Sequence, residues 1–269
     1  MEKSARLTIP DIISRKGKEK LACLTAYTTP IAQLLDDKCD ILLVGDSVGM
    51  VLHGLPTPVG VTLDMMIMHG RAVMRGSSRA LVVVDLPFGS YERNPGHAFK
   101  SASRVLRETG CQAVKIEVCA GVTETVDYLT SRGIPVIAHI GLRPQAANLD
   151  GGFKAKGRTD SEWQQILNDA KAVDEAGAFA IVIEGVTCDL ADEITACVNA
   201  PTIGIGASSK CDGQILVVDD MLGMFKRTPR FVRRYGEIRS LIENAADSFV
   251  RDVRSGAFPG PNEVYRLRK

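Results

Sequence analysis

Eight short apolar runs, separated by stretches with helical spacing, constrain the fold of this 269-residue chain most strongly. The runs are continuous, without alternation of apolar and polar residues, which is typical of strands buried on both faces of a parallel sheet. The expected strands are residues 21–26, 41–45, 80–86, 113–117, 136–140, 179–184, 202–206 and 215–218.

Helical patterns lie between these runs, and several end at a glycine, as helix C-termini often do. The expected helices are residues 62–76, 98–110, 123–133 and 161–177, with a helical tail from residue 230 that ends in a loose segment. Eight strands alternating with helices predict an α/β fold of the (β/α)8 TIM barrel type. An open doubly wound sheet is the alternative, but no GxGxxG follows the first strand. We expect one barrel domain over residues 1–269, with an N-terminal helix and a C-terminal helical extension.

Composition excludes several classes of function. Lys and Arg total 33 against 32 Asp and Glu, so the net charge of +1 gives nucleic acid binding no electrostatic support. No apolar run approaches the length of a membrane span, and the N-terminus lacks an apolar signal core. Seven scattered cysteines without a CxxC pair argue against a disulfide framework or a zinc site. We therefore expect a cytoplasmic protein that acts on small molecules.

Acidic residues end three neighbouring strands. Asp46 and Ser47 follow the second strand, Asp85 ends the third, and Glu117 ends the fourth. Asp46 and Ser47 alone are consistent with a simple turn. In a (β/α)8 barrel, however, the C-terminal strand ends meet at the catalytic mouth, where crowded carboxylates would repel and raise one another's pKa. A magnesium ion held by Asp46, Asp85 and Glu117 resolves that repulsion.

Three further polar residues belong to the predicted strand ends. Lys115 shares a strand face with Glu117, so it either holds a substrate carboxylate or forms a structural ion pair. His139, in the fifth strand, is a candidate substrate contact, with a hydrogen-bonded core imidazole as the alternative. Glu184 ends a buried apolar run, where a carboxylate needs a partner or a function.

Seven motifs occur in an order that resembles the ketopantoate hydroxymethyltransferase family. They are LVGDSVGM, DLPFGSY, VKIE, AHIGLRPQ, GGFKAKGR, GIGA and CDGQILVVDDMLG. The resemblance runs from about Thr8 to Pro259, and the ordered set is far more specific than any one motif. It implies a barrel of the phosphoenolpyruvate mutase and isocitrate lyase superfamily, and a homo-oligomer, commonly a decamer arranged as a double pentameric ring.

The resemblance also implies a reaction. A hydroxymethyl group passes from 5,10-methylenetetrahydrofolate, the co-substrate, to 3-methyl-2-oxobutanoate through an enolate stabilised by Mg²⁺. The product is 2-dehydropantoate, a precursor in pantothenate biosynthesis. The implied metal ligands are Asp46, Asp85 and Glu117; the implied oxo-acid contacts are Asp46, Ser47, Asp85 and Lys115; and the implied acid/base is Glu184.

The chain departs from the family pattern at several positions. Val118 and Cys119 stand where the family has two glycines, and Ser208 replaces a third. Residues 145–148 read QAAN in place of QSVN, and residues 262–265 read NEVY in place of EHSF. None of these is an implied metal ligand. The loss of the glycines is expected to narrow the mouth of the pocket, and so to bear on folate affinity and rate.

Two rival functions remain open on sequence alone. A magnesium-dependent lyase or mutase of the same superfamily is the nearer one, although the segment KIEVCAG does not match the KKCGH-type loop of the lyases. A catalytically inactive barrel is the other, and it predicts the loss of at least one strand-end acid, whereas all are present.

Overall fold

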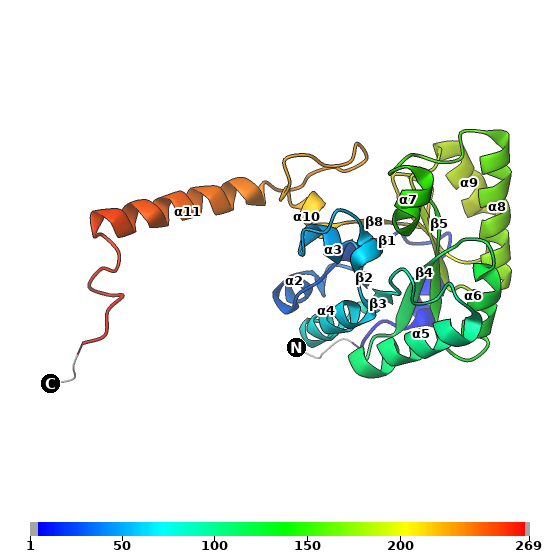
Figure 1. Ribbon diagram of the computed structural model, residues 1–269, viewed down its shortest axis with the longest axis horizontal. Coiled ribbons are helices and arrows are strands. Elements are labelled where there is room, and N and C mark those ends of the chain that lie inside the picture. Colours follow the sequence, from blue (N-terminus) through cyan, green and yellow to red (C-terminus); the bar gives the residue numbers. More distant parts are fainter. Residues whose placement is uncertain (1–4, 267–269) are drawn as a thin grey trace. The chain divides into compact units, whose positions relative to one another are not determined.

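Eight parallel strands close into a barrel (Figure 1). They are β1 (Leu21–Thr25), β2 (Ile41–Val44), β3 (Leu81–Asp85), β4 (Ala113–Glu117), β5 (Val136–Gly141), β6 (Ala180–Glu184), β7 (Thr202–Ile205) and β8 (Gly213–Leu216). Each strand pairs with the next, and β8 pairs with β1. The structure is a computed structural model that describes residues 5–266. It confirms the predicted (β/α)8 barrel.

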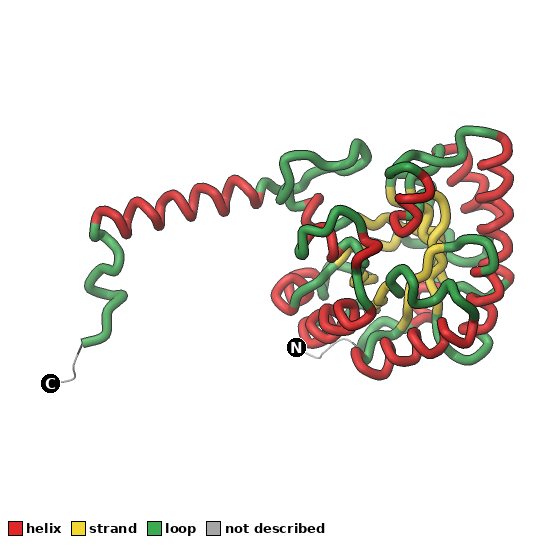
Figure 2. The backbone as a smooth tube through the Cα atoms, viewed as in Figure 1, coloured by secondary structure: helices red, strands yellow, loops and turns green. Residues whose placement is uncertain are grey.

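Helices surround the barrel on its outside and at its two ends, as the tube in Figure 2 shows. They are α1 (Ile9–Ile13), α2 (Thr29–Leu35), α3 (Val48–Val51), α4 (Leu63–Gly76), α5 (Pro95–Thr109), α6 (Val122–Thr130), α7 (Ala147–Asp150), α8 (Asp160–Glu175) and α9 (Cys188–Cys197), with short 3₁₀ turns η1 (Pro58–Gly60) and η2 (Pro144–Ala146). The four predicted helices correspond to α4, α5, α6 and α8. Within residues 5–266, no helix has the length and apolar character that crossing a bilayer requires.

Local sequence sets the helix ends. The Asn94 side chain accepts a hydrogen bond from the third N–H of α5, and Pro95 occupies the first position, where no N–H is needed. The helix ends at Gly110, whose φ of 78° is a left-handed conformation that suits glycine. Thr62 and Thr159 cap α4 and α8 in the same way as Asn94 caps α5.

The barrel interior is filled by apolar side chains from alternate strand positions, because residues two apart in a strand share a face. Ile12 of α1 is fully buried in the same cluster, with Leu7 and Ile9 packed against it. The buried members of this cluster are Ile12, Leu21, Cys23, Ile41, Leu43, Leu81, Val83, Ala113, Ile137, Phe179, Ala180, Val182, Ile203, Ile205 and Ile215. The interior at the amino ends of the strands is therefore apolar, and α1 packs into it.

The chain forms two compact units, Met1–Val217 and Val218–Lys269. The first contains the barrel. The second contains α10 (Val218–Met221) and α11 (Ile238–Ser255). The expected organisation, one barrel domain with an N-terminal helix and a C-terminal helical extension, stays a prediction.

Several predicted boundaries differ from those of the structure, and two of the differences have a clear structural reason. The eighth strand was expected at residues 215–218, but β8 begins at Gly213, where a Cβ would lie 2.6 Å from the Leu21 Cβ. Glycine permits this close approach to β1, and Val218 already belongs to α10. The helical tail was expected from residue 230, but α11 begins at Ile238. The N–H groups of Tyr235 and Ile238 donate to the carbonyls of residues 221 and 222 instead of continuing a helix.

Aspartates at the N-terminal end of the barrel tie loops together. Asp36, which follows α2, accepts hydrogen bonds from Ser77 Oγ and from the backbone N–H groups of residues 78, 79 and 80, just before β3. Burial by itself would raise the pKa of Asp36, but the hydrogen bonds from these donors lower it from 3.8 to about 2. The ionised form is therefore the one that holds this loop.

We predict that Asp36→Asn lowers the free energy of unfolding by about 1–3 kcal/mol near pH 6, because several buried N–H groups lose a charged acceptor. Since the folded pKa lies below the unfolded one, this contribution is fully present above pH 3.8 and is lost as the pH falls through about 2. Urea unfolding at pH 6 and at pH 2.5 measures the difference. An equal cost at both pH values would contradict the ionised role of Asp36.

Candidate active site at the carboxyl ends of the strands

The inward-facing rows change from apolar to charged at the carboxyl ends of the strands. Leu81 and Val83 precede Asp85 on one face of β3, and Ala113 precedes Lys115 and Glu117 on one face of β4. Register places Asp85 beside Lys115, and Glu117 beside His139. These charged side chains thus continue the inward-facing rows at the carboxyl ends of the strands, and 2–5% of each residue's surface is exposed.

Lys115 lies at the centre of this group. Its Nζ is 3.2 Å from Asp85 Oδ1 and 3.3 Å from His139 Nδ1. The contact with Asp85 is an ion pair without hydrogen-bond geometry. Asp85 Oδ1 is buried, and it has no hydrogen-bond donor besides this ion pair. The structure therefore brings together Lys115, Asp85 and His139, which the sequence places on three strands.

Burial and mutual repulsion shift the pKa values of these groups. Burial raises the pKa of Asp85 to about 7; Lys115 opposes this shift and Asp46 adds to it. Burial and the neighbouring Asp46 also raise the pKa of Glu117 well above its ordinary value. Burial lowers the pKa of Lys115, but the Asp85, Asp46 and Glu117 carboxylates raise it further, so the amine stays charged. One buried cation thus faces more acidic groups than it can neutralise.

Asp46 and Ser47 complete the group from the end of β2. The Asp46 N–H donates to Asp85 Oδ2 at 3.0 Å, and Ser47 Oγ lies 2.7 Å from the Tyr27 hydroxyl. Gly45 leaves open the space beside Ser47 and Asp85, since a Cβ there would lie 2.8 Å from Ser47 Oγ and 3.7 Å from Asp85 Oδ2. The segment is therefore more than a turn, because its polar atoms face the other strand-end groups.

His139 connects this group to Glu184. His139 Nε2 is 3.3 Å from Glu184 Oε2, outside hydrogen-bond angles, and Nδ1 is 3.8 Å from Glu117 Oε1. Burial and the Lys115 charge lower the pKa of His139, which favours a neutral imidazole. The Glu184 side chain keeps 17% of its surface exposed, against 2–6% for Asp85, Lys115, Glu117 and His139. Glu184 is therefore the most accessible of these five side chains.

The carboxylates fit a hard divalent cation. Within residues 5–266, no three His, Cys, Asp or Glu side chains are arranged to hold a metal ion by themselves. A cation that keeps several waters and binds through one or two carboxylates plus substrate does not require three. The buried Asp85 Oδ1 without a donor and the raised pKa of Glu117 are both features that a nearby cation would relieve.

Gln145 and Tyr91 belong to the site and were not among the sequence-predicted residues. Gln145 Nε2 donates to Asp46 Oδ2 at 2.7 Å, and its backbone N–H lies 3.2 Å from Glu117 Oε2. The Tyr91 hydroxyl donates to Gln145 Oε1 at 2.7 Å. The signal that could have found Gln145 is its position four residues after β5, on the same side of the barrel as the strand-end acids.

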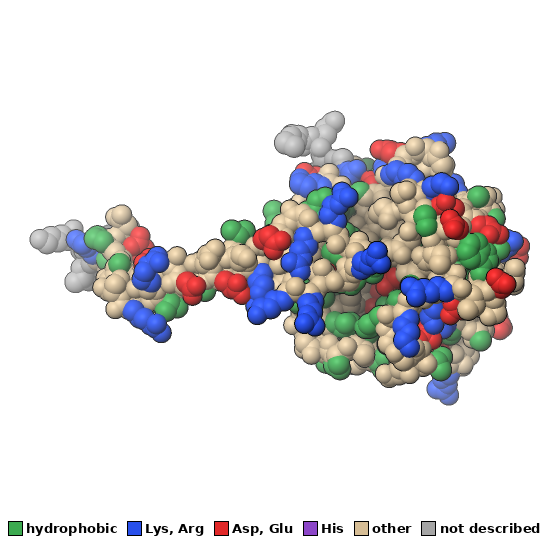
Figure 3. Space-filling model, turned by 90° about the horizontal axis from the view of Figure 1, so that it is seen from above, with side chains coloured by type: hydrophobic (Ala, Val, Ile, Leu, Met, Phe, Trp, Pro, Cys, Tyr) green, Lys and Arg blue, Asp and Glu red, His purple; other side chains and the backbone are tan. Residues whose placement is uncertain are grey.

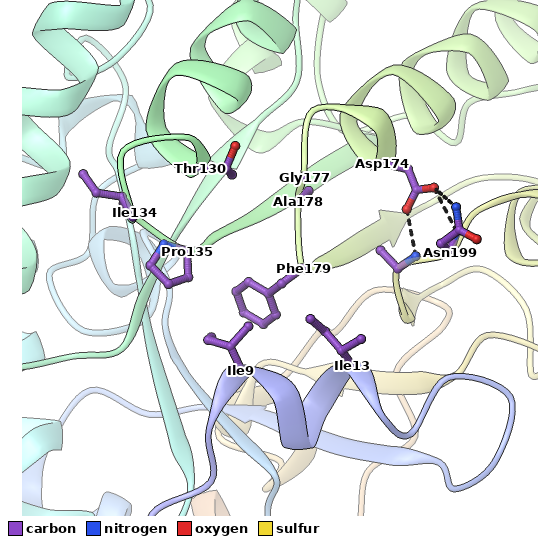
Figure 4. Close-up of a pocket in the computed structure, with 12 residues that line it drawn as sticks. Ile9, Ile13, Thr130, Ile134, Pro135, Asp174, Gly177, Ala178, Phe179 and Asn199 are labelled. Carbon is purple, nitrogen blue, oxygen red and sulfur yellow. Dashed lines mark hydrogen bonds between the residues drawn. The ribbon is translucent and has the colours of Figure 1, made fainter.

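A cavity of about 440 Å³ lies at the opposite end of the barrel (Figure 4). It is lined by Ile9 and Ile13 of α1 and by segments that precede β5, β6 and β7, including Pro135 and Phe179. Its carboxylate, Asp174, already accepts hydrogen bonds from the backbone N–H groups of residues 199 and 200. The residues that precede strands serve stability in this fold, so the charged end is the stronger candidate.

The space-filling view in Figure 3 shows a different hollow, in which acidic side chains are visible.

Solved structures share this fold at low sequence identity. Phosphonopyruvate hydrolase in complex with oxalate and Mg²⁺ matches with a TM-score of 0.61 and 15% identity, over 96% of this chain and 93% of that one. 2,3-Dimethylmalate lyase, a member of the PEP mutase and isocitrate lyase superfamily, matches with a TM-score of 0.61 and 13% identity, over 92% and 84%. These likenesses show that the chain shares the (β/α)8 barrel fold of these proteins.

Comparison of sequences identifies the family. The model of the ketopantoate hydroxymethyltransferase family matches residues 6–261. A 3-methyl-2-oxobutanoate hydroxymethyltransferase from Phenylobacterium zucineum is 61% identical over 98% of this chain and 96% of its own length. Its counterpart from Caulobacter vibrioides is 60% identical over the same shares. With the motifs, the fold and the strand-end residues in agreement, the chain belongs to the ketopantoate hydroxymethyltransferase family.

Proposed function

We propose that the chain transfers a hydroxymethyl group from 5,10-methylenetetrahydrofolate to 3-methyl-2-oxobutanoate through an enolate, giving 2-dehydropantoate in pantothenate biosynthesis. Membership of the family makes it a hydroxymethyltransferase. The observation that carries the finer proposal is the buried Lys115 ammonium, 3.2 Å from Asp85 and surrounded by further acids. That arrangement suits a small anionic substrate that is bound together with a divalent cation.

Magnesium is the proposed cation, and its carboxylate ligands would come from Asp46, Asp85 and Glu117, with water and the oxo acid completing its coordination. Its oxygen ligands and its partial retention of water match this set of donors. The likeness to a hydrolase solved with oxalate and Mg²⁺ supports the choice. When bound, magnesium supplies Lewis-acid polarisation of the 2-oxo acid, which acidifies the adjacent C–H bond.

The chain's own residues then bind the oxo acid and move its proton. Lys115 provides a fixed positive charge for the substrate carboxylate, and Ser47 provides a hydroxyl at the end of β2. Glu184 is the proposed base for the C3 proton, and His139 lies 3.3 Å from it as a neutral imidazole that can orient the carboxylate. The proton stays on Glu184 while the new C–C bond forms. A water supplies the hydroxyl oxygen of the product. Both C–N bonds of the methylene bridge break, and tetrahydrofolate leaves with the C3 proton and one proton of that water.

The test of this function is release of tetrahydrofolate from methylenetetrahydrofolate in the presence of 3-methyl-2-oxobutanoate. We expect turnover only with both substrates and a divalent cation. Turnover of a 2-oxo acid or phosphonate without folate would instead identify a lyase or mutase. No turnover and no oxo-acid binding would support an inactive barrel.

The cytoplasm is the proposed location. All seven cysteines are free thiols, and Cys23, Cys39, Cys111 and Cys211 are buried. Free thiols are typical of proteins in a reducing compartment.

We predict that Asp85→Asn weakens binding of Mg²⁺ and of 3-methyl-2-oxobutanoate together, because it removes charge from the proposed metal site with little change in shape. Calorimetry of each ligand, alone and in the presence of the other, measures this coupling. Asp36→Asn is the matched control, since it makes the same change at the other end of the barrel. Unchanged oxo-acid affinity in Asp85→Asn would refute a shared site.

We predict that Glu184→Gln still binds Mg²⁺ and the oxo acid but exchanges the C3 proton with deuterated water about 10²- to 10⁴-fold more slowly, the usual contribution of a general base. Proton NMR of the oxo acid follows this half-reaction without folate. Glu108→Gln, which alters an acid paired with Arg71 and Arg104, should exchange normally. Wild-type exchange in Glu184→Gln would move the base elsewhere, and loss of binding would make Glu184 a structural support.

A homo-oligomer is the proposed assembly, and α11 is the proposed contact. None of its 18 residues is buried, yet it carries exposed apolar side chains at helical spacing. They are Leu241, Ile242, Phe249, Val250 and Val253. A stripe of this kind marks a surface that another chain covers.

We predict a native mass that is a multiple of 29.0 kDa and is reduced by the double change Leu241→Glu and Phe249→Glu. Light scattering after size exclusion measures it. Asp247→Ala, on the opposite side of α11, is the control and should leave the mass unchanged. A monomeric wild-type chain would refute this assembly.

A further inference from the structure

Gln145 connects its own loop to three other segments of the candidate site. It follows β5, in the turn η2, and 6% of its surface is exposed. Its Nε2 donates to Asp46 Oδ2 at 2.7 Å and to the Leu86 carbonyl at 3.0 Å. Its Oε1 accepts from the Tyr91 hydroxyl at 2.7 Å, and its backbone N–H approaches Glu117 Oε2 at 3.2 Å. The side chain therefore contacts segments that follow β2 and β3, while its backbone contacts the end of β4.

The orientation of the amide is fixed by its partners. The Leu86 carbonyl can only accept a hydrogen bond, so the nitrogen of the Gln145 amide must face it. The same nitrogen then donates its second hydrogen to Asp46, and the oxygen is left for the Tyr91 hydroxyl. Both amide hydrogens are used, so the amide has one arrangement that satisfies every partner.

This arrangement constrains the Asp46 carboxylate. Asp46 lies two residues after the end of β2, and its own backbone N–H donates to Asp85 Oδ2. The Gln145 amide binds the carboxylate at Oδ2 and so restricts its rotation. The partner lies 99 residues away in sequence, on the loop after β5, and both residues are at least nine-tenths buried.

We propose that Gln145 is a positioning residue for the reaction: it orients Asp46 toward the metal and oxo acid, and the Tyr91 hydroxyl holds the amide in place. This inference rests on the proposed function, because Asp46 is a ligand only if a cation and an oxo acid bind here. Partners of this kind typically contribute about 10- to 100-fold in metal affinity or activity.

Gln145→Met is the informative variant. Methionine has a similar length and leaves the backbone N–H beside Glu117 in place, so the change removes only the amide. With Mn²⁺ as the probe for a magnesium site, an electron paramagnetic resonance titration should show affinity weakened about 10- to 100-fold. Tyr91→Phe should show a smaller loss, because the amide remains but its oxygen loses a donor.

A merely structural role is separated by a matched control and a double variant. Gln112→Met removes a glutamine that bridges the Val82 N–H and the Gly110 carbonyl near the start of β3 and β4, so it should lower stability without changing Mn²⁺ affinity. In an Asp46→Asn background, Gln145→Met should add less than about twofold to the loss, because Asp46 is the group through which it acts.

The outcomes are distinguishable. Wild-type protein that binds neither Mn²⁺ nor 3-methyl-2-oxobutanoate overturns the proposed function. Wild-type protein that binds both, with Gln145→Met binding Mn²⁺ equally well, overturns the positioning role while the proposed function stands. A full additional loss in the Asp46→Asn background would overturn it too, because Gln145 would then act by another route. Thermal unfolding and circular dichroism of the metal-free variants confirm that each compared protein is folded.

Discussion

The closed parallel sheet imposes one constraint on everything at its mouth: alternate residues of eight strands face a dry interior. Apolar side chains fill the lower part of that interior, with Ile12 packed into it. At the upper end the same rows carry Asp85, Lys115 and Glu117, and groups so buried cannot rely on water for solvation. They must be balanced by one another or by a ligand. Because one lysine faces several acids, the balance is incomplete in the protein alone.

The two ends of the barrel use the same residue type in opposite ways. Asp36 is surrounded by N–H and O–H donors, which hold its pKa near 2 despite burial. Asp85 receives the Asp46 N–H and the charge of Lys115, yet burial raises its pKa to about 7. Saturating a buried carboxylate with donors stabilises a loop. Asp85 Oδ1 has only the charge of Lys115, 3.2 Å away, to offset its burial, which costs stability. The contrast between the two ends agrees with the proposal of a site at the carboxyl ends of the strands.

The sequence predicted best those features that depend on the residues of a single strand. The bounds of β4 were predicted correctly at residues 113–117. Closure of the barrel places Lys115 beside Asp85, and His139 beside Glu117 and Glu184. The start of β8 was missed because it depends on close packing of Gly213 against β1, which apolar pattern does not reveal. Gln145 was missed because its role arises from hydrogen bonds to residues distant in sequence.

Two of the departures from the family pattern, Val118 and Ser208, lie away from the row that carries Asp85, Lys115 and Glu117. Val118 follows Glu117 in sequence, so it faces the opposite side, where it is 3% exposed; its carbonyl accepts a hydrogen bond from Arg143. A side chain larger than glycine is thus placed outside the barrel interior. Ser208 is engaged elsewhere, since its hydroxyl donates to Asp192 and accepts from the Lys210 N–H. Both residues thus make contacts outside the charged row, and the buried acids keep their partners there.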